Sequence, residues 1–429
     1  MTQTRAERTT AMPASEVELP ELRTNPLSHE ALTELHGDGP RLGLIFAAEP
    51  ELFQSTLHQL HLDADVAARG GGSDRVVVLG IHADWRTSDC GRARRALLVG
   101  ADGLVSRVTL ERPVRLDVGW TLHLPIEGEH ELHAAISADC DRAGLPQINP
   151  HPASARADDK MRAHELWAAH LADGDEFVLP AAARISRGCS AVEAGAQLEA
   201  FLETLDAPTT VIAQPNRGTE GRNALAARIE PDDTHRLGPD HPVVQHLCET
   251  ILPADDALVR QERGNVRFAD RRRVAFRLNV AWNGAEFLAE SGFAQVAPDP
   301  HTAIASRGRE GAIGDINDCL ADLHCPAAEG RRRFVPCADD IVALRRAAVA
   351  AALALNTGLE EDDYLKHMGI DMVLEVNEEP ASVAPVLLEA NPRPAGLNQS
   401  TALRGIAPGP PRRHVTSALF DWISRRVRA

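Results

Sequence analysis

The most informative residues are two short segments near the C-terminus: Gly-Ile-Asp-Met-Val-Leu at residues 369–374 and Leu-Leu-Glu-Ala-Asn-Pro-Arg-Pro at residues 387–394. Each segment reads as an apolar strand with an acidic or amide group where a core residue is expected. Because side chains alternate along a strand, Glu389 and Asn391 share one face, and a hairpin would bring Asp371 to it. Two carboxylates and an amide oxygen are hard ligands, suited to Mg²⁺ held against nucleotide phosphates. The alternative is a pair of surface strands with polar outer faces.

Two arginines accompany these segments. The stiff Asn-Pro-Arg-Pro turn aims Arg393 at the same place, where it would stabilise an anion that develops during phosphoryl transfer. The alternative for Arg393 is a structural ion pair with Glu389 or a neighbour. Arg277 and Asn279 share one face of a predicted strand and are candidates for gripping a phosphate or a substrate carboxylate. A simple cross-strand ion pair is the alternative for Arg277.

A glycine loop is predicted farther upstream. It reads Gln-Pro-Asn-Arg-Gly-Thr-Glu-Gly-Arg at residues 214–222 and lies between predicted strands at 209–213 and 224–229. Glycines expose backbone N–H groups, and Arg217 and Arg222 add positive charge, so the loop is suited to fold over phosphates. A solvent-exposed hairpin turn would give a similar pattern, and this alternative stays open.

Length and charge exclude several classes of protein. The chain has 429 residues, which is enough for two or three domains with cores of their own. A net charge of −17 gives no general attraction for phosphate backbones, so we expect no nucleic-acid partner. No run of about eighteen apolar residues occurs, and we therefore expect no membrane-spanning helix.

Residues 1–40 lack the apolar core of a signal peptide, and we expect a disordered tail rather than a targeting sequence. The seven cysteines are scattered without metal-ligand spacing, which is typical of reduced thiols in a cytoplasmic protein. Of 45 basic residues, only Lys160 and Lys366 are lysines. A lysine retained against such a bias suggests that a compact ammonium is needed at its position.

The remaining pattern divides the chain. Strands alternate with helices over residues 41–150, which predicts a small open α/β domain that ends in a proline-rich boundary. Residues 151–262 are expected to form a linker helix and a small lid subdomain around the glycine loop. Residues 263–429 are expected to form a C-terminal subdomain with the metal site, and Asn283-Gly284 predicts a hairpin turn within it.

The order of these pieces resembles the ATP-grasp superfamily over roughly residues 41–405. The resemblance rests on an α/β domain ending in Gly-Leu-Pro-x-x-Asn-Pro, on Asp-Lys at residues 159–160 opening a helix, on an Ile-x-x-Pro glycine loop, and on the two C-terminal segments. It implies an α/β fold with an α+β lid and an N-terminal Rossmann-like pre-ATP-grasp domain. The chain is most similar to ATP-grasp carboxylate–amine (peptide) ligases of natural-product pathways.

By this resemblance, Asp371, Glu389 and Asn391 match the family's Mg²⁺ ligands, with two ions expected, and Arg277 and Arg393 act on the transferring phosphoryl group. Lys160 matches a lysine that meets ATP phosphates, and Glu262 falls in the hinge that cups adenine. The full set expected at the nucleotide is Lys160, Gln214, Arg217, Gly218, Thr219, Gly221, Glu262 and Asn279. A plain exposed strand end is the alternative for Glu262.

The family phosphorylates a carboxylate with ATP and lets an amine attack the acylphosphate, so the expected substrates are a carboxylate and an amine, each an amino acid or peptide. Two departures matter: the family usually has lysine where this chain has Gln214, and Asn223 stands where the loop often has a small residue. Losing a charge-assisted bond at Gln214 costs on the order of 1.5–3 kcal/mol. A small-molecule kinase, which the same residues would serve, is one alternative. A nucleotide-binding member without turnover is the other, and Gln214 favours it. The oligomeric state stays open, although homodimers are common in the family.

Overall fold

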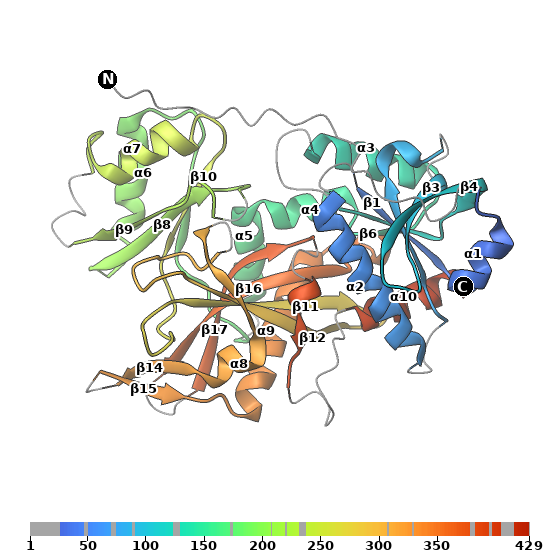
Figure 1. Ribbon diagram of the computed structural model, residues 1–429. Helices are drawn as coiled ribbons and strands as arrows, with labels where there is room; N and C mark the ends of the chain where they lie inside the picture. Colours follow the sequence, from blue (N-terminus) through green and yellow to red (C-terminus); the bar gives the residue numbers. More distant parts are fainter. Residues whose placement is uncertain are drawn as a thin grey trace, which may run out of the picture.

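The computed structural model describes residues 26–46, 50–69, 74–87, 91–122, 129–171, 175–206, 208–218, 221–230, 237–306, 309–327, 330–377, 382–393, 397–404 and 416–428 (Figure 1). Three main sheets organise them, one of them largely parallel and two antiparallel. The predicted α/β fold class is therefore confirmed. No helix among these residues is long and apolar enough to cross a membrane.

The N-terminal sheet has the order β4-β3-β2-β1-β5-β6. Four neighbouring strands, from β2 to β6 in that order, pair in parallel, and β3 and β4 complete one edge as antiparallel strands. The strands are β1 (Arg41–Phe46), β2 (Val77–His82), β3 (Arg92–Val99), β4 (Val105–Arg115), β5 (Val118–Thr121) and β6 (Gln147–Ile148). Parallel strands joined by helices are what the alternating pattern of this region predicted.

Helices cover both faces of this sheet. Helix α2 (Pro50–Arg69) and the C-terminal helix α10 (Ser417–Arg428) pack together on one face, and α3 (Glu129–Arg142) packs on the other (Figure 1). Helix α1 (His29–His36) also lies on the α3 face, with Leu32 only 1% exposed. The disordered tail expected up to residue 40 is thus wrong from α1 onward, because this eight-residue helix buries Leu32 against the sheet.

The second sheet is antiparallel, in the order β7-β10-β8-β9. Its elements are β7 (Ala182–Ile185), α6 (Ala191–Leu202), β8 (Thr209–Pro215), β9 (Leu225–Ile229), α7 (Pro242–His246) with a π-helical continuation η2 (Leu247–Ile251), and β10 (Ala257–Gln261). One face packs against α6 and α7 through Val211, Ala213 and Val259. The opposite face therefore carries the alternate residues, which include Gln214 and Arg260. We call this second sheet, with its helices, the lid.

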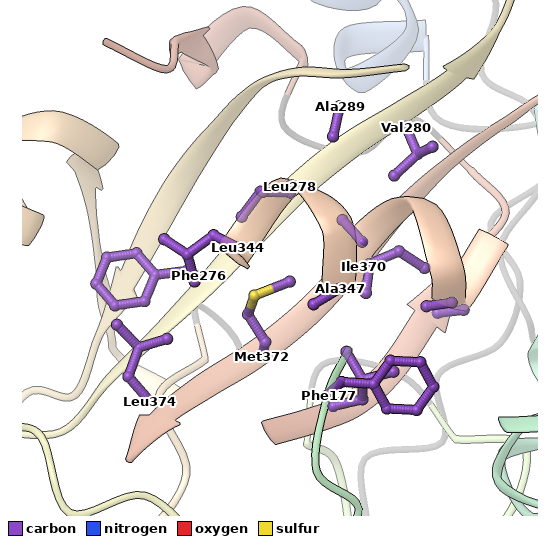
Figure 2. Packing of buried hydrophobic residues seen from close by; sticks show 14 of the residues in the cluster. Phe177, Phe276, Leu278, Val280, Ala289, Leu344, Ala347, Ile370, Met372 and Leu374 are labelled. Atoms are coloured by element: carbon purple, nitrogen blue, oxygen red, sulfur yellow. The ribbon is translucent and has the colours of Figure 1, made fainter. Parts of the chain in front are cut away.

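The third sheet has the order β13-β12-β11-β16-β17, with β18 pairing to β12. Its strands are β11 (Val274–Trp282), β12 (Phe287–Val296), β13 (Ala312–Asp315), β16 (His367–Asn377), β17 (Ser382–Asn391) and β18 (Thr401–Ala402). Helix α9 (Ala338–Asn356) covers one face, and Figure 2 shows its Leu344 and Ala347 against Phe276, Leu278, Ile370 and Met372. The hairpin predicted at Asn283-Gly284 joins β11 to β12.

Alternate side chains of these strands point to the other face of the sheet, away from α9. Phe276 and Leu278 are buried in the core, so Arg277 between them faces away from α9, and Asp371 does the same between Ile370 and Met372. The register between β16 and β17 shifts after Asp371 of β16, and Leu388 of β17 is the extra residue of a β-bulge. Simple alternation put Leu388 in the core. Ala390 lies in the core as alternation predicts, but because of the bulge Leu387 occupies the core in place of Leu388.

Two helices connect the N-terminal sheet to the others: α4 (His151–Asp158) and α5 (Lys160–Leu171), separated only by Asp159. In Figure 1 they run through the middle of the molecule, beneath the lid and above β16 and β17. The remaining elements are η1 (Ala83–Trp85), α8 (Ile316–Ala321), β14 (Leu323–Ala327), β15 (Gly330–Phe334), η4 (Glu361–Asp363) and η5 (Leu397–Gln399).

Candidate active site

The three residues expected to hold Mg²⁺ lie together on neighbouring strands. Asp371 of β16 is directly opposite Glu389 of β17, and Gly369 is opposite Asn391. The amide nitrogen Nδ2 of Asn391 lies 3.3 Å from Oδ2 of Asp371. The two C-terminal segments thus form one acidic surface on paired strands, on the face of the sheet away from α9. We call these three residues the acidic triad.

Arg277 binds the acidic triad from the adjacent strand. Its Nε donates to Oδ1 of Asp371 at 2.5 Å and its Nη2 donates to Oδ2 at 2.6 Å. The same guanidinium lies 4.0 Å from Glu389. Gly369 makes room for it, because a Cβ there would lie 2.7 Å from Cδ of Arg277. The cross-strand ion pair considered as an alternative for Arg277 is therefore present, and it lies within the candidate site.

Two further cations approach Glu389. Nζ of Lys160, at the start of α5, lies 4.0 Å from its carboxylate and also donates to the backbone carbonyls of Asn216 and Gly218. Arg260 of β10 is buried on the inner face of the lid and donates from Nη1 to the carbonyl of Leu388 at 2.9 Å. Sequence reasoning missed Arg260, although a charged residue inside an apolar lid strand was a usable signal.

These charges set the protonation of the two carboxylates. Burial raises the pKa of Asp371 to about 6, against the effect of Arg277, and the charge of Glu389 adds to the rise. Burial also acts to raise the pKa of Glu389, but Lys160, Arg277 and Arg260 together lower it. Two carboxylates this close repel each other, and a divalent cation between them would stabilise both as anions.

The residues fit a magnesium–nucleotide complex. The acidic triad supplies only hard oxygen ligands, and Glu389 keeps 25% of its side chain exposed. Among the described residues, no three His, Cys, Asp or Glu side chains form a complete metal cage. Mg²⁺ usually takes one or two carboxylates and completes its shell with phosphates and water. The acidic triad therefore suits Mg²⁺ carried by a nucleotide better than a tightly held structural ion.

Buried donors without acceptors point to an anionic ligand. Nε2 of Gln214 and Nε of Arg260 are both inaccessible to solvent and have no hydrogen-bond partner within the described part of the chain. They lie on the same face of the lid, because Gln214 pairs with Leu258 and Arg260 with Ile212 in the ladder between β8 and β10. Leaving such donors unpaired costs about 1–3 kcal/mol each, which phosphate oxygens would recover.

The glycine loop is described in part. Arg217 donates its backbone N–H to Asp255 at 2.7 Å, and its guanidinium lies 3.6 Å from Asp159. Gly221 has φ 66°, which favours glycine, and its carbonyl accepts from Arg309. The carbonyl of Gly218 accepts a hydrogen bond from Nζ of Lys160, whereas Thr219 lies outside the described residues. The loop is therefore held at both ends, near the start of α5.

Glu262 and Asn279, both expected to contact the nucleotide, bind other protein residues in this structure. Glu262 pairs with Arg273 at 2.5 Å and with Arg267 at 3.5 Å, so it is not a plain exposed strand end. Asn279 lies on the Arg277 face of β11, but its amide donates to the hydroxyl of Ser400 at 2.8 Å. The structure thus brings Lys160 and Arg277 directly to the acidic triad, places Gln214 on the lid face that carries Arg260, and engages Glu262 and Asn279 with other residues.

Arg393 pairs with a carboxylate that sequence reasoning did not single out. Both terminal nitrogens of Arg393 donate to Asp158, the last residue of α4, and the Nη1 bond measures 2.8 Å. The partner considered from sequence was Glu389 or a neighbour. Asp158 is distant in sequence, and only the packing of α4 against β17 brings it to Arg393.

No family model matches the sequence, and no curated protein matches it either. The chain is similar to several solved structures at low identity. D-cycloserine synthetase DcsG has a TM-score of 0.49 at 16% identity, and the match covers 89% of this chain and 99% of that one. D-alanine–D-alanine ligase from Bacillus anthracis, complexed with ATP, has a TM-score of 0.46 at 13% identity, covering 91% and 98%.

The ATP-grasp ligase PsnB, complexed with a variant of its minimal precursor, Mg and ADP, has a TM-score of 0.44 at 13% identity, covering 91% of this chain and 99% of that one. Scores below 0.5 at such identities assign no activity to this chain. The side chains described above are therefore the basis for inferring a function.

Proposed function

We propose that this protein is an ATP-grasp ligase that activates a carboxylate as its acylphosphate and joins it to an amine, releasing ADP and phosphate. The single observation that carries the proposal is the acidic triad faced by Arg277, Lys160 and Arg260. In this proposal residues 41–150 form the pre-ATP-grasp domain, residues 151–262 the linker helix and lid, and residues 263–429 the C-terminal subdomain, except that the last helix, α10, packs on the N-terminal sheet.

The cations around the acidic triad have separate tasks in this proposal. When bound, ATP supplies the phosphoryl group and Mg²⁺ the charge that neutralises it. Asp371, Glu389 and Asn391 would hold the ion, and Arg277 keeps Asp371 ionised and correctly oriented through its two hydrogen bonds. Lys160 and Arg260 would bind phosphate oxygens from the lid side.

The lid has the groups needed to exclude water. An acylphosphate hydrolyses unless water is kept from it, so closure over the nucleotide is part of the chemistry. The inner face of the lid presents Gln214 and Arg260, whose buried donors would pair with the nucleotide. The glycine loop at residues 216–222 would complete the cover. Arg217 would contribute charge there, because its guanidinium is more than half exposed.

A kinase that stops at phosphoryl transfer to a hydroxyl is the second candidate. The acidic triad and its cations would serve both reactions. Product analysis separates the two, because hydroxylamine converts only an acylphosphate into a hydroxamate.

The test is ADP release from ATP and Mg²⁺ with a panel of amino acids and short peptides, first with hydroxylamine and then with amine acceptors. A ligase gives hydroxamates in the first assay and peptide bonds in the second. The variant Glu389→Gln should reduce the rates of hydroxamate and peptide-bond formation by about 10²-fold or more. It removes the charge of a metal ligand while preserving the shape of the side chain.

Glu375→Gln is the matched control. Glu375 lies on the neighbouring strand β16, has a similarly buried side chain and pairs with Arg263 at 2.6 Å, away from the acidic triad. It should bind nucleotide and turn over like the wild type. If Glu389→Gln were as active as Glu375→Gln, the acidic triad would not be the metal site and the proposal would fail.

A further inference from the structure

Two runs of three consecutive arginines lie together on one side of the molecule. The first run is at residues 271–273, in the connection between β10 and β11, and the second is at residues 331–333, in β15. Arg267, just before the first run, exchanges backbone hydrogen bonds of 2.9 and 2.8 Å with His324 of β14. Nη2 of Arg331 also donates to the carbonyl of Asn265 at 2.9 Å. We call the two runs together the arginine surface.

Acidic side chains neutralise only part of the arginine surface. Arg272 pairs with Asp270 at 2.6 Å, and Arg273 pairs with Glu262 at 2.5 Å. In the described part of the chain, no Asp or Glu forms an ion pair with Arg271 or with any arginine of the second run. The chain has 62 acidic and 45 basic residues, so partners are abundant. A local excess of positive charge therefore remains on a protein whose net charge is −17.

These cations are close enough to repel one another. Burial lowers the pKa of Arg331, and the neighbouring charges of Arg267 and Arg271 lower it further. Arg271 also has a backbone φ of 69°, which residues other than glycine rarely adopt. Repulsion between like charges and backbone strain both cost free energy of folding. The fold itself gains nothing from this arrangement, whereas an anionic partner would relieve the repulsion.

The second run lies on a strand with an open edge. β14 and β15 form a separate two-stranded sheet, and the other edge of β14 meets Arg267. No described strand pairs with the outer edge of β15, so its backbone N–H and C=O groups can pair with a further strand. Arg332 and Arg333 are exposed on this strand. Figure 1 shows the hairpin in orange at the lower edge of the molecule, far from the N-terminal sheet.

We propose that the arginine surface is a docking site for an acidic segment of another polypeptide, which pairs with the outer edge of β15. The inference is independent of the proposed ligase function. Because successive side chains of a strand alternate between its faces, three consecutive arginines present positive charge on both faces of the hairpin. A strand that pairs with β15 therefore needs acidic residues at consecutive positions, and a run of Asp or Glu fits. A long polyanion such as RNA fits less well, because the rest of this acidic protein would repel it.

Fluorescence anisotropy with a labelled oligoglutamate of about eight residues, the length of an ordinary strand, tests the proposal. The wild type should bind this peptide, and the affinity should fall as salt is added, because salt screens exposed charges. Arg332→Glu should weaken binding by about tenfold or more, because it replaces an attraction with a repulsion. Arg271→Gly removes a charge where glycine adopts the backbone conformation freely, so the fold is kept, and should weaken binding by about two- to fivefold.

Arg228→Glu is the matched control. Arg228 lies on β9, the edge strand of the lid sheet, and its side chain is 66% exposed, but it already pairs with Glu230 at 2.5 Å. This variant changes the net charge as much as Arg332→Glu does, and it should bind the peptide like the wild type. Equal losses in the two variants would overturn the docking site, since net charge alone would then explain binding. A wild type that does not bind the peptide would overturn it too, and the arginines would then only protect an exposed strand edge from aggregation.

Two further ligands distinguish strand pairing from simple attraction between charges. An oligoglutamate methylated on alternate backbone nitrogens keeps its carboxylates but loses the N–H groups that a ladder needs, so it should bind more weakly. An oligouridylate of the same charge should also bind more weakly, because it has no backbone amides to pair with β15. If either ligand bound as tightly as the unmodified oligoglutamate, pairing of an acidic strand with β15 would be refuted.

Discussion

Asn149 and His367, 218 residues apart in the chain, hold each other by two reciprocal hydrogen bonds. The side-chain amide of Asn149 donates to the carbonyl of His367 at 2.5 Å and its Oδ1 accepts the N–H of His367 at 3.1 Å. The same amide donates to the carbonyl of Pro392. One side chain after β6 thus fixes the beginning of β16 and the end of β17. Those two strand ends carry the acidic triad.

The first prediction isolates this amide. Asn149 has φ 55°, so alanine would add backbone strain, whereas glycine adopts this conformation freely. Asn149→Gly should therefore lose only the hydrogen bonds and destabilise the protein by about 1–3 kcal/mol, because the freed backbone groups are buried. Urea denaturation measures the free energy of unfolding. A loss smaller than a few tenths of a kcal/mol would mean that water replaces the amide.

The second prediction concerns the buried pair of Arg277 and Asp371. Arg277→Met leaves Asp371, which is 4% exposed, without its bidentate partner. Removing one member of such a pair typically costs about 3–5 kcal/mol, because the remaining charge is uncompensated. Chemical denaturation at neutral pH should show this loss.

Arg263→Met provides the comparison for Arg277→Met. Arg263 also makes a bidentate pair, with Glu375, but its side chain is 28% exposed. Solvent screens such a pair, so its loss should cost about 1 kcal/mol or less. If the two variants were equally destabilised, burial would not be what gives Arg277 its importance.

The strands of the site could be predicted because their apolar alternation is strong, and the turn at Asn283-Gly284 has an unambiguous hairpin signature. The bulge at Leu388 could not, since one extra residue leaves the local pattern of β17 unchanged. Pairings between distant elements were also hidden. The partner of Arg393 depends on how α4 packs, and no pattern near Asp158 indicates it. Arg260 could have been found from sequence, because a charged residue inside an apolar strand is unusual, but its contact with the carbonyl of Leu388 could not.

The third prediction uses the departure at Gln214. Its Nε2 is buried and without an acceptor among the described residues, on the lid face that also carries Arg260. Gln214→Lys would place an ammonium there, and a charge-assisted bond to phosphate is stronger than a neutral one by about 1.4 kcal/mol. Titration calorimetry with ADP and Mg²⁺ should then show roughly tenfold tighter binding. Weaker binding would show that Arg260 repels the added charge and that the glutamine is adapted to this site.

The fourth prediction concerns acid stability. His367 is fully buried against Trp120, and neither ring nitrogen has a hydrogen-bond partner in the described part of the chain. Burial lowers the pKa of His367 from 6.5 to about 3. Between pH 6.5 and pH 3 the unfolded chain therefore binds a proton at this residue that the folded protein does not bind. The contribution of neutral His367 to the free energy of unfolding is fully present above pH 6.5. It is lost as the pH drops toward 3, by roughly 1.4 kcal/mol for each pH unit.

His367→Leu removes that proton, so its unfolding free energy should fall less steeply than that of the wild type between pH 6 and pH 4, whatever its value at pH 7. His133 and His36, whose pKa values burial also lowers, remain and keep part of the slope. Thermal and urea unfolding across this range measure the slope directly. Parallel curves for the two proteins would show that His367 is already protonated in the fold, with water or a rearranged carbonyl beside its ring.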